Sequence, residues 1–387
     1  MDVNITNDIK YIGVDDTTLD LFESQYIIPN GISYNSYLIF DEKIAIMDTV
    51  DRRKSDEWWN NLEKALNGKT PDYLIVHHME PDHAGNIATA VEKYPDLKIV
   101  ASARAIQMLP QFFDETDFSN NTIAVQENDT LCLGKHTLQF FMAPMVHWPE
   151  VMVSFDQTDK VIFSADGFGK FGALCHEEEW ACEARRYYFN ICGKYGIPVQ
   201  TLLKKIAKLD VTCICPLHGP ILSENLSYYI GLYDTWSKYD AETDGVFIAY
   251  ASIHGGTAEA AKKMAEILKL KGVQKVTITD LSRGDMAEAV EDAFRMNRII
   301  LAAASYDGDV FPPMQDFLHH LILKGFQRRK IGIIENGSWA PSAGRVMKNL
   351  LEKMKDLDVV QPMVTIRSRM KQNNITELEA LADAILK

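Results

Sequence analysis

Seven histidine and carboxylate side chains in the first 220 residues have the types and spacing of metal ligands. Four of them stand in "HHMEPDH", in the pattern His78-x-Glu80-x-Asp82-His83. The segment follows the apolar run "DYLIV", so a tight loop after a buried strand would let the four side chains converge. Imidazoles and carboxylates are common protein ligands of zinc and iron. The segment therefore predicts a metal site.

The three remaining candidates lie far along the chain from this motif. They are His147 in "MVHWPE", Asp166 in "FSADGF" and His218 in "CPLHGP". Each follows an apolar stretch and lies close to Pro or Gly, which is typical of the end of a strand. One such histidine alone is more often packed or solvated than a ligand, but the combined set favours a shared site. His77 would point to the opposite side of the extended chain and is not expected to be a ligand.

The order H-x-[HE]-x-D-H, then His, Asp and His, resembles the metallo-β-lactamase fold, an αββα sandwich. Hydrolases of that fold commonly have histidine at the third motif position, where this chain has Glu80. A carboxylate there adds negative charge and a hard oxygen donor. With Asp82 and Asp166 it makes three carboxylates against four histidines, which favours two redox-active iron ions, although zinc stays possible. Asp166, alone in its segment, is the natural bridging ligand.

The C-terminal part has a different pattern, in which continuous apolar strands alternate with helices. The strands are expected in "VFIAYAS", "KVTITDL", "RIILAAAS", "KIGIIEN" and "LDVVQP". This alternation is typical of a doubly wound parallel sheet covered on both faces, with strand order 2-1-3-4-5. We therefore expect two domains, residues 1–243 and 244–387, divided at the polar stretch 240–245. In the first domain, Ser55 is expected to cap a helix that extends to Leu66.

Three loops of this second domain would meet at the carboxyl edge of the sheet, where such folds bind ligands. The first precedes a helix and offers small residues and backbone N–H groups to an anion, and the other two each offer an aromatic ring and glycines. A phosphate loop beside two aromatic loops predicts FMN, and this half resembles flavodoxin. The predicted FMN-binding residues are Ser252, Ile253, His254, Gly255, Gly256, Thr257, Ser305, Tyr306, Asp307, Gly308, Asn336, Gly337, Ser338, Trp339 and Ala340.

The chain of 387 residues carries a net charge of −14, with Lys and Arg well outnumbered by Asp and Glu. An acidic surface argues against nucleic acid as the main partner. No apolar run reaches the about 20 residues that cross a bilayer, and no signal-peptide pattern begins the chain. The six cysteines form no C-x-x-C pair. We expect a cytoplasmic protein with reduced thiols and no membrane partner.

The combination of the two domains resembles the flavodiiron proteins, also called A-type flavoproteins, over nearly the whole chain. The segments "SYNSYLI", "HWP" and "RRYYFNI" also look like that family. The resemblance implies an oxidoreductase that reduces dioxygen to water, nitric oxide to nitrous oxide, or both. It implies that His78, Glu80 and His147 hold one iron and that Asp82, His83 and His218 hold the other. Asp166 would bridge the two ions.

The resemblance also implies how electrons arrive. FMN would feed the irons, and an external donor such as rubredoxin would feed FMN, because the chain looks like the minimal class of the family. Family members place one chain's FMN beside the other chain's irons in a head-to-tail homodimer, so a homodimer or homotetramer is expected. Tyr195 aligns with an aromatic family position near the site. Glu23 stands where many members have a histidine, which leaves the choice of gas open, with dioxygen favoured.

Two other classes of function are compatible with parts of this sequence. A metal-dependent hydrolase of the β-lactamase fold could carry a flavodoxin domain as a regulator. A pure electron carrier could combine a flavodoxin half with a degenerate β-lactamase half. Glu80 and the flavin loops weigh against the hydrolase, and the complete set of seven ligand-type residues weighs against the carrier.

Overall fold

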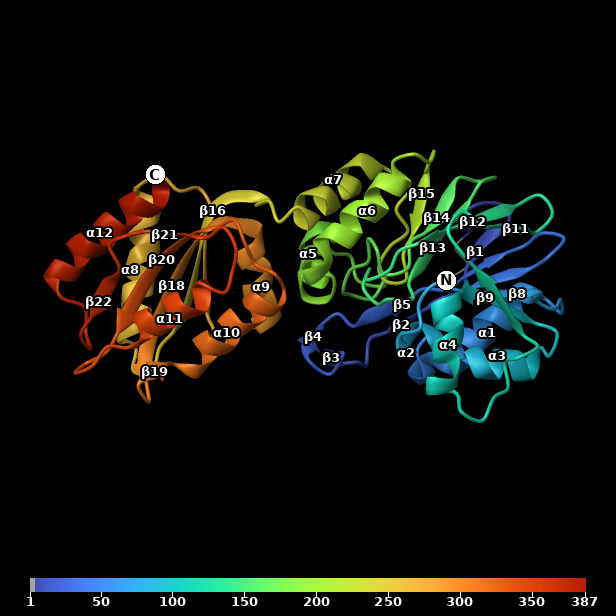
Figure 1. Cartoon of the computed structure of the whole chain (residues 1–387), viewed down its shortest axis with the longest axis horizontal. Coiled ribbons are helices and arrows are strands. Elements are labelled where there is room, and N and C mark those ends of the chain that lie inside the picture. The colour runs from blue at the N-terminus through green and yellow to red at the C-terminus, as the bar shows by residue number, and fades with distance from the viewer. Residues whose placement is uncertain (1–3) are drawn as a thin grey trace. The chain divides into compact units, whose positions relative to one another are not determined.

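The computed structural model describes residues 4–387, which form two compact units. The first unit runs to Tyr188 and also includes Ile197–Asp234, and the second comprises Phe189–Gly196 and Thr235–Lys387 (Figure 1). The expected metallo-β-lactamase-like and flavodoxin-like folds are both confirmed. The domain boundary expected after residue 243 stays a prediction. The compact units divide slightly earlier in the chain, and the second also takes up the short segment around Tyr195.

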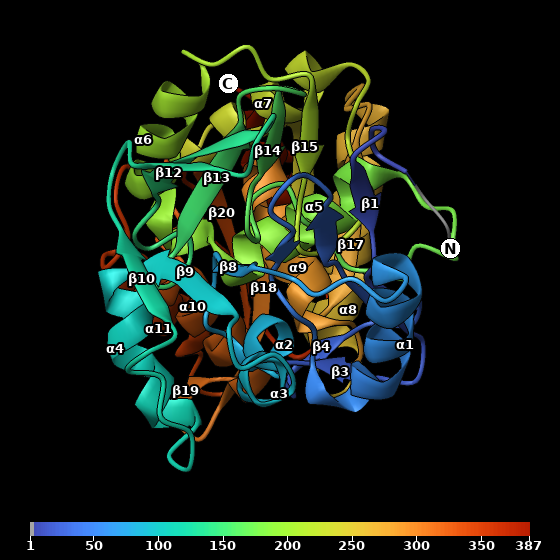
Figure 2. The same ribbon diagram turned by 90° about the vertical axis from the view of Figure 1, so that its right-hand side faces the viewer.

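The first unit is a sandwich of two sheets (Figure 2). One sheet has the order β1-β6-β7-β8-β9-β10, with bounds Ile9–Tyr11, Tyr37–Ile39, Ala45–Met47, Tyr73–Val76, Lys98–Ser102 and Thr122–Val125. The other has the order β11-β12-β13-β14-β15, with bounds Thr130–Cys132, Thr137–Met142, Met152–Asp156, Val161–Phe163 and Cys213–Cys215. Apolar side chains of both sheets, such as Met47 and Phe140, form one buried core cluster between them. The core thus holds both sheets rigidly beneath the loops at their ends.

Short strands and helices complete this unit. Two small antiparallel pairs join β2 to β5 and β3 to β4, with bounds Val14–Asp16, Ile32–Tyr34, Leu21–Phe22 and Tyr26–Ile27. The helices and the 3-10 turn of this unit are η1 (Arg52–Lys54), α1 (Ser55–Leu66), α2 (Pro81–Ala84), α3 (Ile87–Lys93), α4 (Ala103–Phe112), most of α5 (Trp180–Ile191), α6 (Gly196–Ile206) and most of α7 (Leu226–Ser237). The 3-10 turn η2 (Gly193–Tyr195) belongs to the second unit. Helix α4 packs on β9 and β10. Helix α6 is tied to the second sheet because Lys205 Nζ donates to the Met142 carbonyl at 2.7 Å.

The second unit is a parallel sheet with the expected order 2-1-3-4-5. Its strands are β17 (Val276–Asp280), β16 (Thr243–Ala251), β18 (Met296–Tyr306), β20 (Lys330–Asn336) and β21 (Asp358–Val359), with β19 (Asp309–Val310) and β22 (Val364–Ile366) added to β18 and β20. Its helices are α8 (Gly256–Leu270), α9 (Met286–Arg295), α10 (Pro312–Leu323), α11 (Ala343–Leu351) and α12 (Gln372–Leu386). Helices α8 and α12 share a core cluster on one face of the sheet, and α9 to α11 lie on the other (Figure 1).

Two local expectations were wrong, and a third was incomplete. Ser55 is not an N-cap: it is the first residue of α1, and its hydroxyl donates to the Arg52 carbonyl because the 3-10 turn capped by Asp51 leads straight into the helix. Strand β16 begins at Thr243, inside the expected linker, because Thr243 pairs with Met296. The last strand is split around Pro362, which cannot donate a ladder hydrogen bond.

Candidate metal centre and cofactor pocket

The seven predicted ligands all lie at the ends of strands of the two sandwich sheets or just beyond them. After β8 the chain passes through His78 and Glu80 in a loop and then begins α2 at Pro81, a residue suited to the first helical position. Asp82 and His83 therefore lie on a helical turn and not on the expected loop. The other three follow β12, β14 and β15. All seven are buried except Glu80, which is half-buried.

The first group of ligand atoms comes from His78, Glu80, His147 and Asp166. His147 Nε2 lies 3.0 Å from Glu80 Oε2 and 3.0 Å from Asp166 Oδ2. His78 Nε2 lies 3.2 Å from both Glu80 Oε2 and His147 Nε2. An ion with bonds of about 2.1 Å holds neighbouring ligand atoms about 3.0–3.4 Å apart, so these four atoms suit one ion.

The second group comes from Asp82, His83 and His218. Asp82 Oδ2 lies 3.4 Å from His83 Nε2 and 3.3 Å from His218 Nε2. Asp166 Oδ1 lies 3.1 Å from His83 Nε2, whereas its Oδ2 faces His147 of the first group. One carboxylate therefore offers an oxygen to each group, which is the arrangement of a bridge between two ions.

The second group contains buried polar atoms without hydrogen-bond partners. Both Asp82 carboxylate oxygens, both His83 ring nitrogens, His218 Nε2 and Asp166 Oδ1 make no hydrogen bond. Leaving such atoms buried and unpaired costs about 1–3 kcal/mol each, and more when they are charged. Several of them facing one another indicate groups arranged for cations and not for each other. The residues present thus fit a pair of metal ions.

The ionisation of the groups supports the same interpretation. Burial lowers the pKa of His147, but hydrogen bonds with Asp166 and Glu80 outweigh it and raise the pKa to about 9. Burial likewise lowers the pKa of His83, while the charges of Asp82 and Asp166 raise it to about 8. Burial raises the pKa of Asp166, but the neighbouring histidines hold it well below its usual range. Without metal, protons on His147 and His83 would offset part of the charge of the buried carboxylates.

Two groups outside the predicted set orient the metal-facing histidines. Glu150 Oε1 accepts hydrogen bonds from His78 Nδ1 at 2.7 Å and from the Met79 N–H at 3.0 Å. The Ser33 carbonyl accepts from His218 Nδ1 at 2.7 Å. Each bond places a proton on Nδ1 and leaves Nε2 turned toward the site. Glu150 stands in the same "MVHWPE" segment as His147, but that alone did not single it out.

His77 and Tyr195 are members of neither ligand group. His77 is buried, with its ring between Asp48 and the Ser154 hydroxyl, which agrees with its expected exclusion. Tyr195 ends the 3-10 turn η2 in the second compact unit, half-buried, with Lys194 Nζ 5.9 Å from its ring centre. The catalytic role of Tyr195 stays a prediction.

A second site lies in the second unit, where a pocket of about 650 Å³ opens at the carboxyl edge of the parallel sheet. It is lined by thirteen of the fifteen predicted FMN residues: Ile253, His254, Gly256, Thr257, Ser305, Tyr306, Asp307, Gly308, Asn336, Gly337, Ser338, Trp339 and Ala340. Ser252 and Gly255 do not line it. Instead the Ser252 hydroxyl accepts from the Gly255 N–H at 3.2 Å and so shapes the turn that enters α8.

The pocket is also lined by three residues that the sequence had not indicated, Ala304, Ser368 and Arg369. Ser368 and Arg369 follow β22, which pairs with β20 and ends at the same edge of the sheet. The split of the last strand hid this loop, because the expected strand ended at Pro362. The Ser368 carbonyl would lie 2.1 Å from a Cβ at Gly256, so glycine is required where the loop meets the start of α8.

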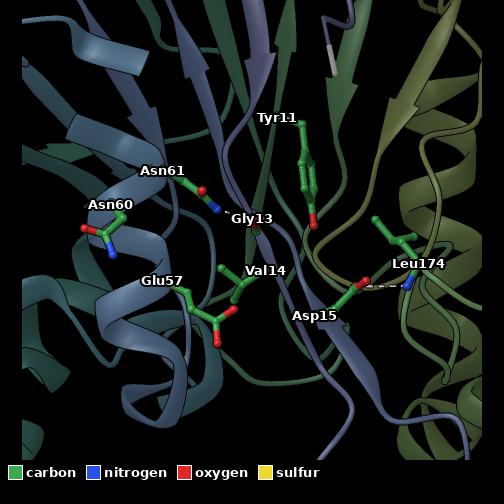
Figure 3. Close-up of a pocket in the computed structure, with 8 residues that line it drawn as sticks. All are labelled: Tyr11, Gly13, Val14, Asp15, Glu57, Asn60, Asn61 and Leu174. Atoms are coloured by element: carbon green, nitrogen blue, oxygen red, sulfur yellow. Dashed lines mark hydrogen bonds between the residues drawn. The ribbon is translucent and has the colours of Figure 1, made fainter. Parts of the chain in front are cut away.

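The first unit also has an open pocket of about 340 Å³ beside α1, shown in Figure 3. Several of its polar groups already have partners within the chain. Asp15 accepts from the backbone N–H groups of Leu174 and Cys175, and Asn61 Nδ2 donates to the Gly13 carbonyl at 3.0 Å. It contains none of the predicted site residues, and nothing in it converges on a ligand.

Comparison with known proteins agrees with both halves. Residues 32–219 match the family model described as ODP family beta lactamase. The fold superposes with a TM-score of 0.92 on rubredoxin oxygen:oxidoreductase from Desulfovibrio gigas, 24% identical, covering 100% of this chain and 98% of that one. The flavodiiron protein from Giardia intestinalis also gives 0.92, at 20% identity and with coverage of 99% and 96%. The anaerobic nitric oxide reductase flavorubredoxin of Aliivibrio fischeri is 28% identical over 351 residues, covering 88% of this chain and 70% of that protein.

Over nearly its whole length the chain is similar in fold to flavodiiron proteins, and in sequence to the flavorubredoxin relative. The names of two of these proteins describe oxidoreductases. Among residues 4–387, no helix is both long and apolar enough to cross a membrane.

Proposed function

We propose that this protein reduces dioxygen to water, nitric oxide to nitrous oxide, or both, at a pair of iron ions supplied with electrons by FMN. The observation that carries the proposal is the placement of Asp166 between two groups of ligand atoms, one oxygen toward each. A site for one ion would not need two such groups. Iron is favoured over zinc because the ligands include three carboxylates, and hard oxygen donors suit iron through its redox changes.

The roles of the seven residues follow from the two groups. One ion would be held by His78, Glu80 and His147. The other would be held by Asp82, His83 and His218, and Asp166 would bind both ions. When bound, the iron pair would supply electrons to the gas at open coordination positions. The protein holds the ligands rigidly because each lies at the end of a sheet strand with a buried core beneath it.

FMN fits the pocket of the second unit. The start of α8 presents backbone N–H groups that suit a phosphate. Tyr306 and Trp339 are 47% and 90% exposed at its edge, which is unusual for large aromatic rings and suits rings that a flat heterocycle would cover. When bound, FMN would pass on electrons one at a time. His254 and Arg369 are the basic side chains that line the pocket.

Two further parts of the proposal concern partners. A rubredoxin-type protein would donate electrons to FMN, and the chain would assemble as a head-to-tail homodimer or as a homotetramer. The flavorubredoxin relative carries a rubredoxin element in its name, which supports this kind of donor.

The test is a paired turnover assay, started without oxygen. One preparation with iron and FMN receives NADH, a rubredoxin reductase and rubredoxin, and then either gas at the same low concentration. Fast loss of dioxygen, the expected preference, identifies an oxygen reductase, whereas faster loss of nitric oxide with nitrous oxide formed identifies a nitric oxide reductase. Asp166→Ala should abolish turnover of both gases while FMN stays bound.

The same preparations test the alternatives. Two zinc ions per chain and no turnover of either gas would favour a hydrolase of the β-lactamase fold. An Asp166→Ala variant that passes electrons from rubredoxin as well as the wild type does would favour a simple electron carrier.

A further inference from the structure

The turn that joins β3 to β4 has an unusual backbone. Glu23 and Ser24 both have positive φ, 48° and 56°, and the Gln25 N–H donates to the Phe22 carbonyl at 3.1 Å. Two successive residues of positive φ make a turn of type I′, which strongly prefers Asn-Gly. Glu-Ser in that place is strained, and strain of this kind is found where a site requires a particular side chain. In this turn, Glu23 is the side chain that such a site would require.

Aromatic packing fixes this turn beside the ligands of the second group. The Phe22 ring meets the His218 ring edge-on, with 5.4 Å between centres and 88° between planes. Phe22 also packs on Phe171 at 5.6 Å, and Tyr26 on the other side of the turn packs on Phe171 at 5.9 Å. Phe22 and Tyr26 are buried. The position of Glu23 is therefore set by the packing beneath it and not by the turn sequence.

The Glu23 side chain faces the first group of ligands. It lines a pocket of about 290 Å³ together with Glu80 and Asp82. Gln25 Nε2 donates to Glu23 Oε2 at 3.2 Å. Two carboxyl groups held against each other repel when ionised, and a cation between them removes that repulsion.

We propose that Glu23 is an additional carboxylate ligand of the metal ion held by His78, Glu80 and His147, reaching it through this pocket. The assignment rests on the proposed metal centre. Charge supports it: Glu80, Asp82 and Asp166 contribute −3 against +4 for two divalent ions, and Glu23 completes the balance. A neutral centre is favoured in a buried place, since uncompensated charge there is costly. Gln25 would orient the ligand, as outer groups commonly do.

The test titrates Co²⁺ alone into metal-free protein and follows both the affinity of each ion and its visible absorption. Wild type is compared with Glu23→Gln and Glu23→Asp. The matched control is Asp51→Asn, which removes a carboxylate from the same pocket while an asparagine can still accept from the Arg53 N–H. We expect two ions per chain throughout, with one of them bound about tenfold or more weakly in both Glu23 variants and with an altered absorption spectrum. Asp51→Asn should weaken binding much less and leave the spectrum unchanged.

Three results would overturn the assignment. The first is wild-type affinity and spectrum for both ions in Glu23→Gln. The second is equally weakened binding in Asp51→Asn, which would indicate a general charge effect. A wild-type chain that binds no Co²⁺ would contradict the metal centre itself. If Glu23→Gln does not fold, Glu23→Gly replaces it, because glycine accepts the positive φ, and the same weakened affinity is expected.

Discussion

Glu150 illustrates how the metal site depends on single residues that are not ligands. It is buried, and one of its oxygens accepts from both the His78 ring and the Met79 N–H. The ring of His78 would otherwise be free to rotate or to place its proton on Nε2. Glu150 thus fixes the ring orientation and the proton position of His78 in the absence of metal.

We predict that Glu150→Gln lowers the affinity for the metal ion held by His78 by about 10–100-fold, because the amide is a poorer acceptor for the ring N–H. Competition with a coloured chelator measures this for each of the two ions. Glu63→Gln on the exposed side of α1, where Glu63 pairs with Lys93, serves as the control. An equal loss in both variants would contradict the role given to Glu150.

His136 is a second residue whose surroundings the sequence did not reveal. It is fully buried, with Nδ1 3.0 Å from Asp156 Oδ2 and Nε2 3.3 Å from Asp8 Oδ2. Lys135 also pairs with Asp8, and Asp159 lies nearby. Burial lowers the pKa of His136, but the bonds with Asp156 and Asp8 outweigh it, so its pKa is raised. The protonated ring therefore stabilises the fold.

This shift predicts a pH-dependent stability. Because the pKa of His136 is raised in the folded state, its contribution to the free energy of unfolding is complete below its unfolded pKa of about 6.5. That contribution is lost as the pH rises through the folded pKa. His136→Gln should cost about 2 kcal/mol near pH 6. The difference in Tm between wild type and variant should shrink steadily toward pH 9. A difference that is constant with pH would show that His136 acts through packing alone.

At the scale of elements, the edge of the parallel sheet decides the cofactor pocket. Strands β16, β18 and β20 are neighbours in register, so the loops after them meet. The Ser305 hydroxyl accepts from the Ser342 N–H at 2.8 Å and so links the second loop to the third. Trp339 lies in this third loop and is itself 90% exposed.

Trp339→Ala should therefore affect FMN and not the fold. Loss of one stacked ring costs about 1 kcal/mol, which corresponds to a Kd about fivefold higher. Quenching of flavin fluorescence measures this Kd, and the Tm of the FMN-free protein should stay unchanged. Tyr228→Ala, an exposed aromatic residue on α7, is the control. An unchanged Kd would place the flavin elsewhere.

The strained turn between β3 and β4 allows a further prediction at this scale. Glu23→Gly should raise the Tm of the metal-free protein, because it removes both an unfavourable φ and the repulsion from Glu80. Differential scanning calorimetry without metal measures the change, with Ser24→Gly as a control that relieves backbone strain alone. A lower Tm in Glu23→Gly would mean that the turn is not strained by Glu23.

At the scale of the whole molecule, the metal centre and the flavin pocket belong to different compact units. In the proposed head-to-tail dimer, each metal centre would be served by the partner's flavin. A dimer that pairs an Asp166→Ala chain with a chain unable to hold FMN should then regain part of the turnover that either homodimer lacks. Failure to regain any would favour electron transfer within one chain.

The sequence by itself determined much of this protein. Continuous apolar strands, alternating with helices, specify a parallel sheet locally, and the order 2-1-3-4-5 followed. All seven ligand-type residues were found because each follows a buried strand, and the structure brings them into two adjoining groups. Thirteen of the fifteen residues expected around the flavin line one pocket for the same reason, since loops at strand ends meet at one edge.

Only the tertiary structure decided the rest. The sequence singled out neither Glu150 nor Arg369 and did not show what the Glu23 side chain faces, because these positions depend on packing between residues far apart in the chain. The two carboxylate oxygens of Asp166 lie beside different ligand groups because both sheets of the sandwich contribute ligands around it. Ser55 was misjudged because capping depends on the path of the chain before the helix. Side-chain type is encoded locally, whereas the direction in which a side chain points is set by the core beneath it.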